Sequence, residues 1–286
     1  MITILSGTET TVEASPDKPT VVIGERINPT RKKELTTALR EGRLELVEKE
    51  ALAQKDEGAD VIDVNVGAPG VDEIAILPQA VRLAAEATGL PVSIDSSHPK
   101  AIEAALKVCP GKPLINSVSG ETKSLEKVLP LARDYGAAVI GLCLDDSGIS
   151  TDPMKRLEIA KRILERACAL GIPVEDVVFD PVVTAVGIDH TAGKVTLETM
   201  KLISGELKAN LALGSSNISH GLPYRPYLNN SFLALSILNG ATLPIVNPGA
   251  PGLMETVRGT DLLLGKDIKA RRYLKLYRDR LKKPQI

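Results

Sequence analysis

Residues 137–144 read AAVIGLCL and form the longest apolar run of the chain. The run is apolar at consecutive positions, whereas a strand with one solvated face alternates between apolar and polar residues. It therefore predicts a strand buried on both faces, as in a parallel sheet that helices cover. Seven shorter runs of this kind occur elsewhere, at residues 20–24, 61–66, 91–94, 113–115, 177–179, 211–214 and 243–246.

Segments with helical periodicity separate these runs. Leu44, Val47 and Ala51 recur at helical spacing in a segment that stops at Gly58, and Asp152 has the residue type preferred at a helix N-cap. Eight strand–helix units of about 35 residues predict an α/β fold, the (β/α)8 TIM barrel. A doubly wound sheet is disfavoured, because the sequence contains no glycine-rich GxGxxG turn after the first run.

We expect one domain over residues 1–286, with the barrel over residues 20–264. Residues 1–19 alternate around a turn, which predicts a β-hairpin that could plug the N-terminal end of the barrel. Residues 265–286 are amphipathic and rich in Lys and Arg, and they predict a solvated C-terminal helix.

Composition excludes several classes of partner. The chain has 35 Lys plus Arg against 36 Asp plus Glu, so it lacks the surplus of positive charge that binding to nucleic acid or an acidic membrane requires. Its three cysteines have no metal-ligand spacing, and we expect neither disulfides nor a bound metal. No apolar run is long enough to span a membrane and no export signal is recognisable, so we expect a cytoplasmic protein.

Polar residues end the apolar runs. In a (β/α)8 barrel the carboxyl ends of the strands form the active site, so these residues predict a polar ring around a ligand site. The ring has no Lys, Arg or His pair at the strand ends, which disfavours a phosphate-rich substrate. Its members are Glu25, Asp63, Asn65, Asp95, Asn116, Asp145, Asp180, Ser216, Asn217 and Asn247.

Two kinds of ligand suit such a ring. A pterin presents two parallel N–H donors that one carboxylate accepts, while amides satisfy its ring nitrogens and carbonyl. Mg²⁺ or Ca²⁺, which prefer oxygen ligands, is the alternative, as in a metal-dependent hydrolase or aldolase. A zinc site or a covalent hydrolase is disfavoured, because His98, His190 and His220 are scattered and no GxSxG motif occurs.

The strand ends also resemble those of a known family. The strings VVIGERIN, DVIDVNVGAP, VSIDSS, LINSVSG, YGAAVIGLCLDDSGI, VVFDPVVTAVG and LGSSNIS occur in this order between residues 21 and 264. Together they resemble the pterin-binding methyltransferases, which include the methyltetrahydrofolate:corrinoid protein methyltransferases and the folate-binding barrel of cobalamin-dependent methionine synthase.

The resemblance implies roles for individual residues. Asp95, Asn116 and Asp180 would hold the pterin ring, and Asn217 would lie near its N5 atom as the catalytic residue. The other pocket residues that it implies are Glu25, Asp63, Asn65 and Ser216. It also implies the activity: an enzyme of one-carbon metabolism that moves a methyl group between tetrahydrofolate and the cobalt of a corrinoid.

The corrinoid (cobalamin) would come from a separate protein, because 286 residues leave no room for the cobalamin-binding modules of methionine synthase. We expect this corrinoid protein to dock on segments rich in small residues, at residues 67–70, 147–150 and 221–226. Members of the family are often homodimers, which is the oligomeric state that the resemblance implies.

Dihydropteroate synthase, a more distant relative, is the main alternative. Its arginine-containing diphosphate loop after the second strand is replaced here by NVGAPG at residues 65–70, and Asp180 is followed by PVVTAVG without the family's lysine. Without these cations a diphosphate leaving group has no evident clamp, which favours the methyltransferase. A barrel that binds folate without catalysis is the second alternative.

Overall fold

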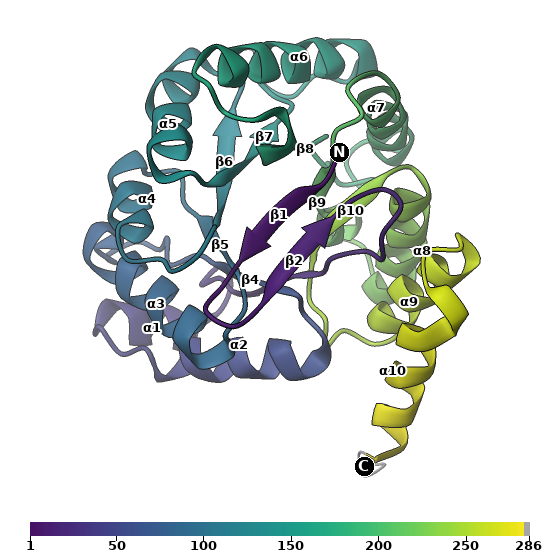
Figure 1. Ribbon diagram of the computed structural model, residues 1–286, viewed down its shortest axis with the longest axis horizontal. Helices are drawn as coiled ribbons and strands as arrows, with labels where there is room; N and C mark the ends of the chain where they lie inside the picture. Colours follow the sequence, from purple (N-terminus) through teal and green to yellow (C-terminus); the bar gives the residue numbers. More distant parts are fainter. Residues whose placement is uncertain (283–286) are drawn as a thin grey trace.

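Eight parallel strands close into a barrel in the computed structural model, which describes residues 1–282 (Figure 1). The order around the barrel is β10-β3-β4-β5-β6-β7-β8-β9, and this confirms the predicted (β/α)8 class. The strands are β3 (Ile23–Ile27), β4 (Val61–Val64), β5 (Val92–Asp95), β6 (Leu114–Ser119), β7 (Ala138–Leu142), β8 (Val177–Asp180), β9 (Leu211–Gly214) and β10 (Ala241–Val246).

Helices surround the barrel and connect its strands (Figure 1). The predicted boundary signals are confirmed: Asp152 accepts a hydrogen bond from Met154 N at 2.9 Å at the start of α6, and Gly58 ends α2 with a φ of 104°. The α-helices are α1 (Lys33–Arg40), α2 (Glu45–Glu57), α3 (Glu73–Thr88), α4 (Pro99–Leu106), α5 (Thr122–Tyr135), α6 (Pro153–Ala169), α7 (Ala192–Glu206), α8 (Arg225–Leu238), α9 (Leu253–Leu263) and α10 (Arg271–Lys282). The described residues also include the short 3₁₀ helices η1 (Val174–Asp176), η2 (Ser215–Ser219) and η3 (Ile268–Ala270).

The first barrel strand begins later than predicted. The sequence predicted residues 20–24, whereas β3 spans Ile23–Ile27 and includes the charged Glu25 and Arg26. Thr20 instead binds the buried Asp261 of α9, through its backbone N at 2.9 Å and its hydroxyl at 2.7 Å. The apolar run therefore leads into the barrel, and the strand continues into polar residues at the ligand end.

The N-terminal hairpin closes one end of the barrel. It consists of β1 (Thr3–Ser6) and β2 (Thr11–Ala14), and Leu5 is fully buried in the apolar cluster that fills the barrel interior. Asn210, which precedes β9, donates from Nδ2 to Thr3 Oγ1 and to Ala14 O, both at 2.9 Å. Figure 1 shows the hairpin lying across the barrel, and its contacts with residues that precede strands place it at the N-terminal end. The predicted hairpin and its location are confirmed.

The chain continues after the barrel as a helix. Asp267 accepts hydrogen bonds from the backbone of Arg272 and Tyr273 at the start of α10, and Arg272 also binds Asp60 at 3.1 Å. This confirms the predicted C-terminal helix, which begins at Arg271 and not at residue 265, because residues 265–270 form a turn and η3. Its described part ends at Lys282, and residues 283–286 of the predicted segment lie outside the described residues. Among residues 1–282, every helix is too short or too polar to span a lipid bilayer.

Candidate functional site

A cavity of about 590 Å³ opens at the carboxyl end of the barrel. It brings together most of the polar residues that the sequence predicted at the strand ends, from β3 round to β10. The predicted residues that line it are Glu25, Asp63, Asp95, Asn116, Asp180, Ser216, Asn217 and Asn247.

A hydrogen-bonded group of acids and amides forms one part of the cavity wall. Ser93 Oγ at 2.6 Å and Asn116 Nδ2 at 3.2 Å both donate to Asp63 Oδ1. Burial, and after it the charge of Asp95, raises the pKa of Asp63 well above its usual range. Burial also raises the pKa of Asp95 to about 6, against hydrogen bonds from Asn65 and Asp63. Asp63 therefore holds the proton of this pair, and Asp95 can accept donors from a ligand.

Asp180 is presented by a backbone turn that a buried arginine holds. Its Oδ1 accepts from Val182 N at 2.7 Å, and Val182 has a φ of 64°, a region that β-branched residues rarely occupy. Arg156 of α6, 1% exposed, donates to Pro181 O at 2.7 Å and Val182 O at 2.8 Å. Burial raises the pKa of Asp180 to about 6, so the carboxyl is mostly anionic at neutral pH.

Asn217 and Ser216 belong to η2, directly after β9. Asn217 is exposed at the cavity mouth, and its Nδ2 lies 3.0 Å from where a Cβ on Gly214 would be. The missing side chain at position 214 therefore allows the amide to lie across the strand end. Ser216 donates a hydrogen bond to Glu25. Burial raises the pKa of Glu25 to about 7, although this hydrogen bond and the charges of Lys32 and Arg225 act to lower it.

Two predicted ring members do not line the cavity. The side chain of Asn65 instead bonds Asp95, which does line the cavity, and its Oδ1 accepts from Gly67 N at 2.8 Å. Asp145 folds the loop after β7 instead, because its carboxylate accepts from Ser147 and from Arg162 of α6.

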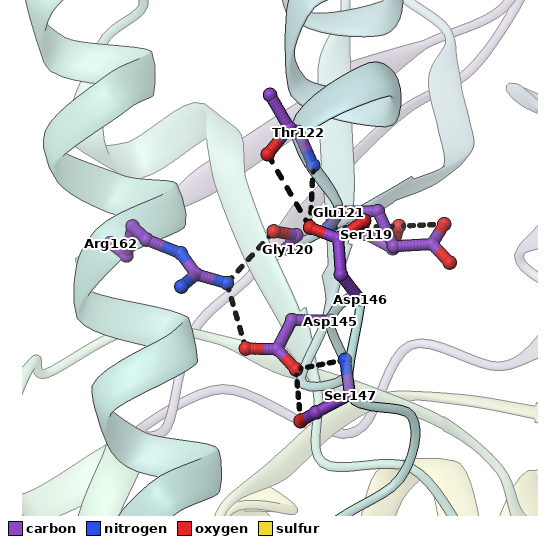
Figure 2. Close-up of polar contacts among 8 residues, drawn as sticks. All are labelled: Ser119, Gly120, Glu121, Thr122, Asp145, Asp146, Ser147 and Arg162. Carbon is purple, nitrogen blue, oxygen red and sulfur yellow. Dashed lines mark hydrogen bonds and ion pairs between the residues drawn. The ribbon is translucent and has the colours of Figure 1, made fainter.

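Figure 2 shows that this loop is tied to the one after β6. Arg162 Nη2 donates to Gly120 O at 2.8 Å and to Asp145 Oδ2 at 3.0 Å, and Asp146 accepts from the backbone and hydroxyl of Thr122. The hydrogen bonds of Ser147 and Arg162 lower the pKa of Asp145. The two loops therefore form one connected rim beside the cavity.

The expectation of a ring without cationic side chains was wrong. Arg26 lies within β3 itself, and loops that follow β3 and β9 bring further basic groups to the cavity. The basic cluster RKK at residues 31–33 was a signal for these cations in the sequence. It follows the strand by several residues, so the sequence did not indicate that its side chains return to the cavity. The basic residues that line the cavity are Arg26, Arg31, Lys32, His220 and Arg225.

The cavity has few features of a metal centre. Within residues 1–282, no group of three or more His, Cys, Asp or Glu side chains is arranged to hold a metal ion. The acids of the cavity are instead bonded to serine, amide and backbone donors, as Asp63 and Asp180 illustrate. This environment suits carboxyls that accept hydrogen bonds from an organic ligand.

Comparison with known proteins agrees with this geometry. The family described as "Pterin binding enzyme" matches residues 24–247. The methylcorrinoid:tetrahydrofolate methyltransferase of Eubacterium limosum is 30% identical over 266 residues, which cover 90% of this chain and 96% of that protein. Two structures of Yersinia pestis dihydropteroate synthase share the fold. The one with a pterine–sulfa conjugate has a TM-score of 0.69 at 18% identity, and covers 92% of this chain and 98% of its own. The other has a TM-score of 0.68 at 19% identity, with 92% and 99% covered.

Proposed function

The chain belongs to the pterin-binding enzyme family, and from that premise we propose that it is a methyltransferase acting between tetrahydrofolate and a methylcorrinoid. The corrinoid is a substrate that a separate protein carries to the barrel, where its cobalt gives or accepts the methyl group. The observation that carries the proposal is the set of buried acids and amides in the cavity, on a chain 30% identical to a methyltransferase of this kind.

The headgroup of the folate would bind to Asp95, Asn116 and Asp180. A pterin offers its 2-amino group and N3–H as parallel donors, which one anionic carboxylate accepts with both oxygens. Asp180 suits this role because the backbone turn at Val182 already fixes its orientation. Asn116 can serve the mixed donors and acceptors of the ring, while Glu25, Asp63, Asn65 and Ser216 hold or complete the pocket.

Asn217 would act at N5, where the methyl group is attached or removed. A departing ring nitrogen develops negative charge unless a donor stabilises it, so the useful interaction is stronger in the transition state than in the ground state. The Asn217 amide can donate or accept by rotating, and it needs no buried charge to do so. In the opposite direction N5 is the nucleophile, and the same amide positions the ring.

The corrinoid protein would approach the open mouth of the cavity. Asn217 is exposed there, so a cofactor carried by another protein could reach an atom bound beside it. The segments proposed for docking, residues 67–70, 147–150 and 221–226, are largely exposed and follow β4, β7 and β9 at the same end of the barrel. The loop with Ser147 is also held in place by Asp145 and Arg162, as Figure 2 shows.

The proposal is tested by methyl transfer between methyltetrahydrofolate and free cob(I)alamin, followed by the visible spectrum of the corrinoid. The wild-type protein is expected to catalyse it, and Asn217→Ala to lower the rate about 10²–10³-fold while tetrahydrofolate still binds. Asn239→Ala, at the far end of α8, is the matched control and is expected to keep the wild-type rate.

The outcomes separate the alternatives. A barrel that only binds folate would bind tetrahydrofolate without transferring the methyl group. A dihydropteroate synthase would instead condense a pterin diphosphate with p-aminobenzoate. An unchanged rate in Asn217→Ala would remove the catalytic role of that residue while leaving the activity.

A further inference from the structure

Basic side chains gather on one side of the cavity. Arg31 and Lys32 follow β3, and Arg225 follows β9 and η2. Because β3 and β9 both border β10, these three residues lie over one arc of the barrel, and we call them the cationic wall. The acids of the proposed headgroup site, Asp95 and Asp180, end β5 and β8 outside this arc.

The cationic wall has no carboxylate partner in the described part of the chain. No ion pair within 4.0 Å joins Arg31, Lys32 or Arg225 to an acid of residues 1–282, whereas Arg26 in the same cavity pairs with Glu50 and Glu57. Positive groups that gather on one side of a cavity without an ion-pair partner repel one another, and a cluster of this kind is typical of sites that bind anions.

Neutral groups fix the position of two of these cations. Arg225 donates from Nε to Ser219 Oγ and from Nη2 to Ser216 O, both at 2.9 Å. Lys32 donates to the carbonyl of Arg26. These bonds orient both side chains and use neutral oxygens as acceptors, not carboxylates.

The titratable neighbours of the cationic wall do not neutralise it. Burial raises the pKa of Glu25 to about 7 in spite of Lys32 and Arg225, so this acid is only partly ionised near neutral pH. Glu50, whose charge also acts on Lys32, already accepts a hydrogen bond from Arg26 at 2.7 Å. Burial, followed by the charges of Arg225 and Arg31, lowers the pKa of His220, which is therefore neutral there.

We propose that the cationic wall of Arg31, Lys32 and Arg225 binds the carboxylates of the folate tail, and that the preferred substrate carries several glutamates. This inference rests on the proposed function, because it places the headgroup among Asp95, Asn116 and Asp180. A folate held there must direct its benzoyl-glutamate tail to the mouth of the cavity. The tail has one free α-carboxylate for each glutamate and one γ-carboxylate at its end. Each additional glutamate therefore adds one carboxylate that the cationic wall can bind.

The test compares three ligands by titration calorimetry: 6-methyltetrahydropterin, which has no tail, and tetrahydrofolate with one and with three glutamates. For the wild-type protein we expect affinity to increase along this series, by about tenfold or more from first to last. The double variant Arg31→Gln/Lys32→Gln should lose this increase and keep its affinity for the tail-less pterin. Lys33→Gln removes an adjacent exposed charge that does not line the cavity, and it should behave as wild type.

Salt provides a second measurement on the unmodified protein. Added NaCl should weaken binding of the triglutamate and leave the tail-less pterin nearly unaffected, since exposed charges are screened. Equal affinity of the wild type for all three ligands would overturn the inference, as would a loss in the double variant that is the same for all three. If none of the three binds to the wild-type protein, it is the proposed function itself that fails.

Discussion

The two ends of the barrel differ in polarity and in their exposure to solvent. At the N-terminal end the β1–β2 hairpin covers the interior, and Leu5 is fully buried among apolar side chains. At the carboxyl end the strands finish in acids and amides around an open cavity, where burial raises the pKa of Glu25, Asp95 and Asp180. One end gains stability by removing apolar surface from water, and the other gives up stability by keeping ionisable groups partly out of water.

This difference indicates how the molecule divides stability and function. Substitutions in the β1–β2 hairpin should change the free energy of unfolding and leave ligand affinity unchanged. Removing an acid from the cavity should instead lower ligand affinity without a comparable loss of stability.

Leu5→Ala should produce the largest change. It leaves a cavity in the barrel interior, and such a substitution costs about 2–5 kcal/mol in the free energy of unfolding. Chemical denaturation measures the cost, and calorimetry well below the unfolding transition should give an unchanged tetrahydrofolate affinity. Ile4→Ala, at a side chain that is 43% exposed in the same strand, should stay within about 0.5 kcal/mol of wild type. A large loss of affinity in Leu5→Ala would contradict the independence of the two ends.

Asp180→Asn should chiefly weaken binding. In the proposed complex, the charged acceptor of two pterin donors becomes an amide with one donor facing them, so affinity should fall by about tenfold to a hundredfold. The free protein should be as stable as wild type or more stable at neutral pH, because a buried charge has been removed. Asp134→Asn, at an exposed acid of α5, is the control for the loss of one negative charge. Unchanged affinity in Asp180→Asn would assign the headgroup to another acid.

Changing the pH should move stability and affinity in opposite directions. Burial raises the pKa of Asp95 and Asp180 from 3.8 to about 6, so the folded protein binds protons more tightly than the unfolded chain does. The contribution of these acids to stability therefore falls as pH rises from about 4 to about 7. In the proposed complex the pterin headgroup binds to the anions of these two acids, so affinity should be constant above about pH 7. Below about pH 6 it should fall roughly tenfold per unit for each acid involved.

These trends are measured by thermal unfolding without ligand and by calorimetry with tetrahydropterin over the same range. The Asp180→Asn variant should have a shallower dependence in both, since one of the two acids no longer titrates. Affinity that does not change between about pH 5 and about pH 8 would mean that neither acid is the acceptor of the pterin donors.

The fold was largely predictable because each barrel strand is a local pattern. Eight continuous apolar runs and helix signals such as Asp152 and Gly58 depend on neighbours in sequence alone. The bounds predicted for the first barrel strand were too early, because its end carries the charged residues Glu25 and Arg26, and a pattern of hydrophobic residues does not extend a strand over such residues. Thr20, in the segment before this strand, is hydrogen-bonded to Asp261, which lies 241 residues further along the chain, so the contact could not be predicted from local sequence.

The cavity was predictable in part for the same reason. Residues at the strand ends, such as Asp95 and Asp180, are brought together by the barrel itself. Arg31 and Arg225 lie in connecting segments, where the route of the backbone decides whether a side chain returns to the cavity. Asp145 is the opposite case, a strand-end acid that was predicted to line the cavity and does not. Its carboxylate accepts hydrogen bonds from Ser147 and Arg162 and so holds the loop after β7.

Asp63→Asn should have the smallest effect of the series. Ser93 and Asn116 both donate to Asp63 Oδ1, and the proton of the Asp63–Asp95 pair therefore resides on the other oxygen of Asp63. Asparagine keeps an acceptor for those donors and places an N–H where the proton was. Stability and tetrahydrofolate affinity should consequently change by less than about 0.5 kcal/mol. A loss as large as that of Asp180→Asn would instead mean that Asp63 is ionised and that Asp95 holds the shared proton.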